Sequence, residues 1–146
     1  ALLGPYGARL AQRKGPYRTG AIGISVGALC MVAYGFLPTP ELMLSVFFLH
    51  ILNDGFTVTS AGVAVGMAAP PERQAGAQGL LGGVQTLVGG LAASIAGWSY
   101  DNFGRGTTYT STAIVMVVFI ALGLFLAGDK RWSAAPATDE SPAVVH

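Results

Sequence analysis

Charged residues are scarce in this sequence. Asp, Glu, Lys and Arg make up 10% of the 146 residues, whereas 52% of the residues are hydrophobic. This mixture leaves too few polar side chains to cover the surface of a water-soluble domain. The chain also lacks the basic face that nucleic-acid-binding proteins present. We therefore expect a lipid bilayer as its main partner and no nucleic-acid partner.

Residues for enzymatic chemistry are equally scarce. The chain has one cysteine, Cys30, and two histidines, His50 and His146, and none belongs to a cluster with metal-ligand spacing. No phosphate-binding loop ending in Gly-Lys-Ser or Gly-Lys-Thr occurs. Residues Gly23–Gly27 match the G-x-S-x-G pattern of hydrolases, but that motif needs a strand-to-helix turn and here lies in an apolar run. We predict no enzyme activity, no catalytic residue, no cofactor and no metal.

Four hydrophobic runs are long enough to cross a membrane as helices, which takes about 20 residues each. Strands are excluded because the runs do not alternate and would leave edge hydrogen bonds unsatisfied in hydrocarbon. Connectors with Pro or Gly separate the runs, so consecutive helices should be antiparallel. The sequence predicts an all-α integral membrane fold of four antiparallel transmembrane helices. The runs are Thr19–Leu37, Leu42–Met67, Gly79–Trp98 and Tyr109–Ala127.

Lysine and arginine lie almost entirely on one side of the predicted bundle. Only Arg105 falls on the other side, and this bias predicts that the basic side is cytoplasmic. The C-terminus is then cytoplasmic, in a multi-pass protein of the inner (plasma) membrane. We predict three segments: the end of a preceding helix with a basic cytoplasmic loop (1–18), the bundle (19–128) and a disordered cytoplasmic tail (129–146). The basic residues on the cytoplasmic side are Arg9, Arg13, Lys14, Arg18, Arg73, Lys130 and Arg131.

The most informative polar residues share one face of the second run. Asp54 lies about 20 Å from the outer end of this run, close to the middle of a bilayer. An ionisable group at that depth faces water or a partner and often belongs to a proton or substrate path. His50 lies one turn away, and a histidine can change charge near neutral pH. The alternative is a structural role, in which Asp54 bonds to a neighbouring helix and the polar stripe is buried. The stripe consists of His50, Asn53, Asp54, Thr57 and Ser60.

A weaker polar line and three glycine pairs lie on the helices. Gln85 follows Gln78 by seven residues and could contact substrate or bond to another helix. The first and fourth runs have no Asp, Glu, Lys, Arg or His between 20–37 and 109–127, so we expect those helices to face lipid. Pairs with G-x-x-x-G spacing predict faces for close helix packing. They are Gly23 with Gly27, Gly62 with Gly66, and Gly79 with Gly83.

Three stretches between the runs resemble motifs of the major facilitator superfamily. The first is similar to the basic loop before the family's ninth helix; Arg13 and Gly15 match it, whereas Ala8 and Gln12 stand for the usual Gly and Asp. The second resembles the entry to the eleventh helix, and the third resembles the end of that helix. With the four runs, the resemblance covers residues 4–128. The stretches are Ala8–Arg18, Pro70–Gly82 and Ala96–Gly104.

The resemblance implies that the four runs are helices nine to twelve of a twelve-helix bundle, and that the N-terminal half of the transporter is missing from this chain. In the family the tenth helix lines the central cavity, the eleventh flanks it, and the ninth and twelfth lie outside. The motifs look most like those of drug and metabolite proton antiporters. The resemblance also implies that Arg13, Gly15 and Arg73 belong to loops that hold one conformation.

The sequence therefore predicts secondary active transport, as proton-coupled efflux of small amphipathic compounds by alternating access. We expect protons as the coupling ion and a small-molecule substrate. One alternative is import of a nutrient such as a sugar or an organic acid. Another is a membrane interaction module of four helices that does not transport. The residues expected on the substrate or proton path are His50, Asn53, Asp54, Thr57 and Gln85.

Overall fold

The computed structural model describes residues 4–133, and this part of the chain is all-helical, without strands. Nothing is described of the side chains of residues 52, 131 and 132, and the predicted tail lies outside the described residues from 134 onward. The helices are α1 (Gly4–Lys14), α2 (Pro16–Phe36), α3 (Pro40–Ala68), η1 (Pro71–Arg73), α4 (Gln74–Ala127) and η2 (Gly128–Trp132).

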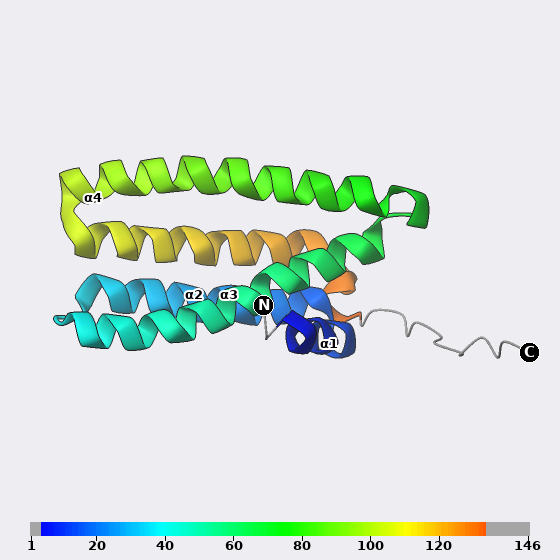
Figure 1. Ribbon diagram of the computed structural model, residues 1–146, viewed down its shortest axis with the longest axis horizontal. Helices are drawn as coiled ribbons and strands as arrows, with labels where there is room; N and C mark the ends of the chain where they lie inside the picture. Colours follow the sequence, from blue (N-terminus) through cyan, green and yellow to red (C-terminus); the bar gives the residue numbers. More distant parts are fainter. Residues whose placement is uncertain (1–3, 134–146) are drawn as a thin grey trace, which may run out of the picture.

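Within the described residues, three helical segments are long and apolar enough to cross a membrane: α2, α3 and the segment Pro71–Lys130 that contains α4. The prediction of an all-helical protein with long apolar helices is therefore confirmed. The third segment is not one straight helix, because Gly104 interrupts α4 with φ 75° and ψ 176°. Figure 1 shows that the two halves of α4 lie side by side and run in opposite directions.

The reversal within α4 takes less chain than the sequence suggests. The predicted runs leave residues 99–108 between them as a connector, but helical structure continues on both sides of Gly104. The hydroxyl oxygens of Ser99 and Thr108 lie 3.0 Å apart across the bend, and Thr108 also donates to the carbonyl of Gly104 at 3.0 Å. The rings of Trp98 and Phe103 meet edge to face, 5.5 Å apart. The bend is therefore closed by its own side chains.

Arg105 joins the bend in α4 to the end of α2. Its Nη2 donates to the carbonyl oxygen of Leu37 at 3.0 Å, and its Nη1 lies 3.9 Å from the sulfur of Met43. Leu37 is the C-cap of α2. The last carbonyls of a helix lack partners within the helix, so the guanidinium satisfies one of them.

The middle of the structure is α2, which packs against α3 on one side and the second half of α4 on another. Its outward side carries Ile22, Leu29 and Phe36 with exposed fractions of 63%, 70% and 69%. Large apolar side chains exposed in a row are expected where lipid or further helices cover them. The helix that was expected to face lipid thus has one packed face and one exposed apolar face.

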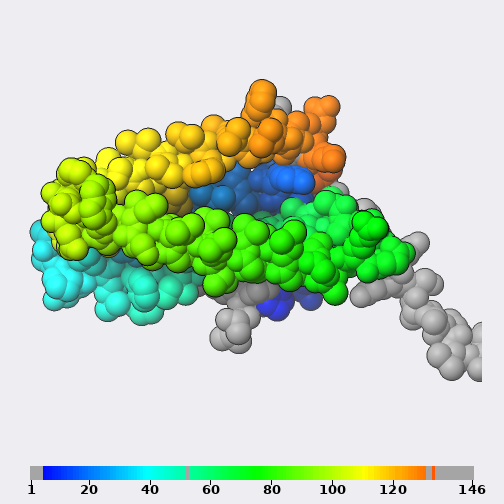
Figure 2. All heavy atoms as spheres, turned by 90° about the horizontal axis from the view of Figure 1, so that it is seen from above, coloured from blue at the N-terminus to red at the C-terminus, as the bar shows by residue number. Residues whose placement is uncertain are grey.

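The first half of α4 stands apart from α2. Figure 2 shows that the two halves of α4 diverge from the bend and that part of α2 is visible between them. Apart from Leu81, Ala96 and Ser99, its residues from Gln78 to Gly104 are exposed. This half meets α3 near its own start, where Gln78 donates from Nε2 to the carbonyl oxygen of Gly62 at 2.9 Å.

The short helix α1 lies across the end of the bundle where α2 begins (Figure 1). It is amphipathic: Gly7 and Ala11 are buried, whereas Arg9 and Arg13 are exposed. A Cβ at Gly7 would lie 3.2 Å from the ring of Phe56 in α3, so α1 packs closely on that helix. Only Gly15 separates α1 from α2.

We expect Gly104→Ala to lower the stability of the protein by about 1–3 kcal/mol, because φ near 75° with ψ near 180° is a conformation that only glycine adopts readily. The matched control is Gly123→Ala, in regular helix, where a Cβ would have no described atom within 4 Å apart from the backbone of α4 and the adjacent residues. That control should be neutral or stabilising, because alanine favours helix over glycine. Thermal unfolding in detergent measures both, and equal effects of the two substitutions would contradict the strained bend.

Candidate functional site

The polar stripe of α3 divides between two environments. Asn53 and Ser60 are buried, with 8% and 2% of their surfaces exposed. The side chain of Asp54, by contrast, is 62% exposed. Adjacent residues of a helix point about 100° apart, so the burial of Asn53 turns Asp54 away from the packed interface.

Glycines of α2 make the room for the buried part of the stripe. A Cβ at Gly23 would lie 2.5 Å from Thr57 Oγ1 and 3.3 Å from Asn53 Oδ1. A Cβ at Gly27 would lie 3.2 Å from Asn53 Nδ2 and 3.1 Å from the Cε of Met116 in α4. The pair Gly23 and Gly27 therefore lies at a close helix contact, and the residues that fill it are an amide and a hydroxyl.

The hydroxyl groups of the stripe are satisfied within α3 itself. Thr57 donates to the carbonyl of Asn53 at 3.2 Å, and Ser60 donates to the carbonyl of Phe56 at 2.7 Å. Such bonds to the preceding turn let hydroxyl side chains lie in an apolar setting without an unsatisfied donor. Thr57 and Ser60 thus serve as small polar packing groups at the contact with α2.

His50 and Asp54 form the charged part of the site. His50 Nε2 lies 3.5 Å from Asp54 Oδ1, one turn along α3, and the His50 side chain is 18% exposed. The ring of Tyr34 in α2 lies 5.8 Å from the His50 ring, and Tyr109 in α4 lies 5.7 Å from Tyr34. The His50 ring therefore packs against the ring of Tyr34. Its Nε2 approaches the exposed carboxylate of Asp54.

Tyr34 is the residue that sequence reasoning missed. It is 8% exposed, and within the described part of the chain its hydroxyl has no hydrogen-bond partner. Tyr34 lies in the first run, which has no Asp, Glu, Lys, Arg or His, so the polar stripe of the second run was the stronger sequence signal. A tyrosine inside an apolar helix was the available signal, because its hydroxyl needs a partner when it is buried.

The other predicted residues lie apart from this cluster. Gln85 is exposed on the first half of α4, whereas Gln74 and Gln78 donate to the carbonyls of Gly66 and Gly62 at 3.2 and 2.9 Å. Apart from the backbone of α4 itself and the adjacent residues, no described atom lies within 4 Å of a Cβ built at Gly79 or Gly83. The pair on α3 therefore meets glutamine side chains, and the pair on α4 faces open space in the described structure.

The predicted loop residues lie at helix ends. Arg13 is in the last turn of α1 and Arg73 is the N-cap of α4, and both are exposed. Gly15, between α1 and α2, has φ 88°. Among residues 4–133, no group of three His, Cys, Asp or Glu residues could hold a metal ion.

Comparison with protein families assigns nearly the whole chain to one of them. The description of that family is Major Facilitator Superfamily, and the match covers residues 1–144. The chain belongs to this family. No curated protein and no solved structure matches it.

Membership in the major facilitator superfamily identifies a membrane transporter of that type. It agrees with the long apolar helices, and together they identify a multi-pass membrane protein embedded in lipid. The predicted resemblance to this superfamily is confirmed at the level of the family. The polar groups of α3 are therefore the polar groups of a transporter helix.

We expect Gly23→Ala to destabilise the protein by about 1–3 kcal/mol, because its methyl group would overlap the hydroxyl of Thr57. Thr57→Ala in the same chain removes that hydroxyl and should restore part of the loss, which a double-mutant cycle in thermal unfolding measures. The control is Gly20→Ala, whose nearest neighbour, Ser60 Cβ, is at an ordinary 3.5 Å. Additive effects of the first two substitutions would show that the two residues do not meet.

Proposed function

We propose that this chain is the C-terminal part of a proton-coupled exporter of small amphipathic compounds, working by alternating access between two helical halves. On this proposal α2, α3 and the two halves of α4 are four antiparallel transmembrane helices, the ninth to twelfth of a twelve-helix bundle. The N-terminal half of the transporter supplies the opposite wall of the substrate path.

The observation that carries the proposal is the exposure of Asp54. It lies in the middle of α3, between Pro40 and Ala68, and 62% of its side chain is open. A carboxylate at such depth is too costly to leave facing lipid, so it requires a water-filled cavity or a polar partner. In a transporter, a carboxylate on the helix surface that faces the water-filled cavity can bind a proton or a substrate.

His50 gives Asp54 a partner that can exchange a proton. His50 Nε2 and Asp54 Oδ1 are 3.5 Å apart, so a small side-chain rotation would bring them within hydrogen-bond distance. Protonation of this pair changes its charge at the path, and a substrate cation or the counter-transported proton would compete for the carboxylate. The tilted contact with Tyr34 supports one face of the imidazole. We propose His50 and Asp54 as the coupling site.

The remaining predicted path residues have different proposed roles. We propose that Gln85 lines the path, since it is exposed on the first half of α4. Asn53 and Thr57 instead hold α3 against α2, because their polar atoms lie against Gly23 and Gly27. Arg13 and Arg73 remain proposed cytoplasmic loop residues that favour one conformation, together with Gly15.

The exposure of the first half of α4 supports the proposal that helices outside this chain pack against it. Leu80, Leu87 and Ile95 are 70%, 65% and 66% exposed, and the glycines of this half face open space. A helix with small residues on its surface packs closely on other helices in lipid. We propose that Gly79 and Gly83 meet helices outside this chain. The positive-charge bias supports a cytoplasmic C-terminus in the inner membrane.

We expect Asp54→Asn to abolish the part of efflux that depends on the proton gradient, because the amide keeps the shape and cannot titrate. Efflux of a panel of fluorescent dyes from cells expressing the intact protein measures this, before and after the gradient is collapsed with an uncoupler. His50→Gln should flatten the dependence of efflux on external pH.

The matched control is Asp101→Asn, an exposed carboxylate near the bend of α4. It should leave efflux unchanged, and surface expression of all variants is compared by immunoblot. Wild-type efflux that survives Asp54→Asn with its gradient dependence intact would exclude Asp54 from coupling. Uptake of a sugar or organic acid, in place of dye efflux, would reverse the proposed direction of transport.

A further inference from the structure

A second site lies at the junction of α1, α2 and α3, apart from the His50–Asp54 pair. It is a pocket of about 470 Å³, within the range of small-ligand sites. Neither His50 nor Asp54 lines it, and its occupant need not be the transported substrate. The lining residues are Leu10, Lys14, Arg18, Thr19, Ile22, Gly23, Val26, Leu49, Asn53 and Phe56.

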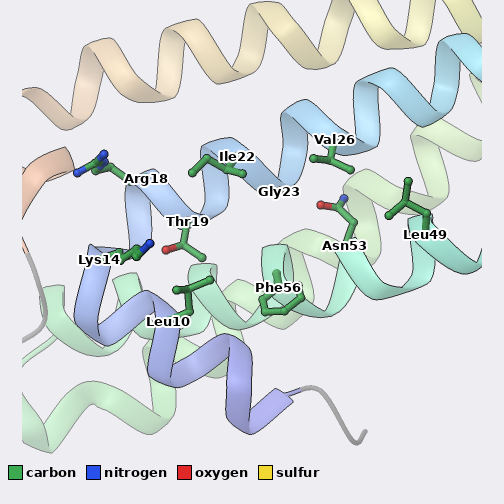
Figure 3. A pocket seen from close by; sticks show the side chains of 10 residues that line it. All are labelled: Leu10, Lys14, Arg18, Thr19, Ile22, Gly23, Val26, Leu49, Asn53 and Phe56. Carbon is green, nitrogen blue, oxygen red and sulfur yellow. The ribbon is translucent and has the colours of Figure 1, made fainter.

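The pocket has a cationic end and an apolar end. Figure 3 shows Lys14 and Arg18 at one end, where α1 meets α2, and Val26 and Leu49 at the other. Arg18 and Val26 are eight residues apart, about 12 Å along α2. None of the ten lining residues is acidic.

The geometry points to an anionic phospholipid, with its phosphate between Lys14 and Arg18 and one acyl chain along α2 toward Val26 and Leu49. Lysine acts as a point charge for phosphate. The guanidinium of Arg18 has five N–H donors, so it can bind a phosphate and a protein group at the same time. The apolar lining residues can contact an acyl chain, which a free phosphate ion does not have. Both parts of an amphipathic anion are thus matched.

The exposure of the apolar walls favours a lipid over a soluble anion. Ile22 and Leu49 are 63% and 51% exposed, so the groove opens along the sides of the helices. In a membrane those sides face acyl chains. Basic pockets between transmembrane helices on the cytoplasmic side are suited to anionic headgroups, because the inner leaflet is negatively charged. This step rests on the cytoplasmic placement of α1 that was proposed from the charge bias.

A lipid in this position would connect α1 to the close contact between α2 and α3. Lys14 is the last residue of α1, while Gly23 and Asn53 belong to that contact and also line the pocket. The bound lipid therefore fixes the orientation of α1 and fills the groove beside the glycines. We expect it to stabilise the folded transporter, since a ligand that binds only the native state does so.

The test is binding of phosphatidylglycerol to the intact protein in detergent, followed by native mass spectrometry, with phosphatidylcholine as the uncharged comparison. The double variant Lys14→Gln with Arg18→Gln should weaken phosphatidylglycerol binding by roughly thirty-fold, as expected for two cations near a membrane surface. The charge-matched control is Arg9→Gln with Lys130→Gln, two exposed cations that do not line the pocket. It should bind like the wild type.

A second variant tests the apolar end without changing charge. Val26→Trp should fill the groove and weaken phosphatidylglycerol binding while Lys14 and Arg18 remain. Equal binding by wild type and both pocket variants would overturn the proposal, as would equal losses in the control. Displacement of the lipid by millimolar inorganic phosphate would identify a soluble-anion site instead. Because the readout is binding, a failure of proton-coupled efflux leaves this result unaffected.

Discussion

The structure depends on the close contact between the glycines of α2 and the polar face of α3. Gly23 and Gly27 leave space that Asn53 and Thr57 fill, and a methyl group at either glycine would meet a neighbouring atom at 2.5–3.1 Å. This contact fixes the rotation of α3 about its axis. Asp54 follows Asn53 directly, so with one residue held against α2 the other must turn outward. The exposure of the carboxylate is thus a consequence of helix packing.

The ends of the helices are satisfied by side chains as well as by turns. Arg105 donates to the carbonyl oxygen at the C-cap of α2, and Gln74 and Gln78 donate to carbonyl oxygens of α3. Such bonds satisfy carbonyl groups near helix ends that would otherwise depend on water. They also tie both halves of α4 to the pair α2 and α3. The transporter segment is held by polar side chains at its ends and by glycine contacts in its middle.

The sequence predicts the long helices well because hydrophobic length and helix breakers decide them. It predicts less about the bend: a single glycine with positive φ reverses α4, and the connector around it stays helical because Ser99 and Thr108 close it. The stripe of α3 is visible in the spacing of its residues. The spacing does not show which of these residues are packed and which are exposed, because that depends on glycines in another helix. Tyr34 joins the cluster only through the tertiary approach of α2 to His50.

The central claim is that Asp54 faces water while Asn53 faces α2. Single substitutions Asp54→Cys and Asn53→Cys, each in a Cys30→Ala background, allow a direct measurement with a hydrophilic maleimide applied to the intact protein in membranes. Maleimides react with the thiolate, which forms in water and not in lipid or in a packed interface. The account predicts rapid labelling at position 54 and little at position 53. Labelling at 53 with none at 54 would contradict it.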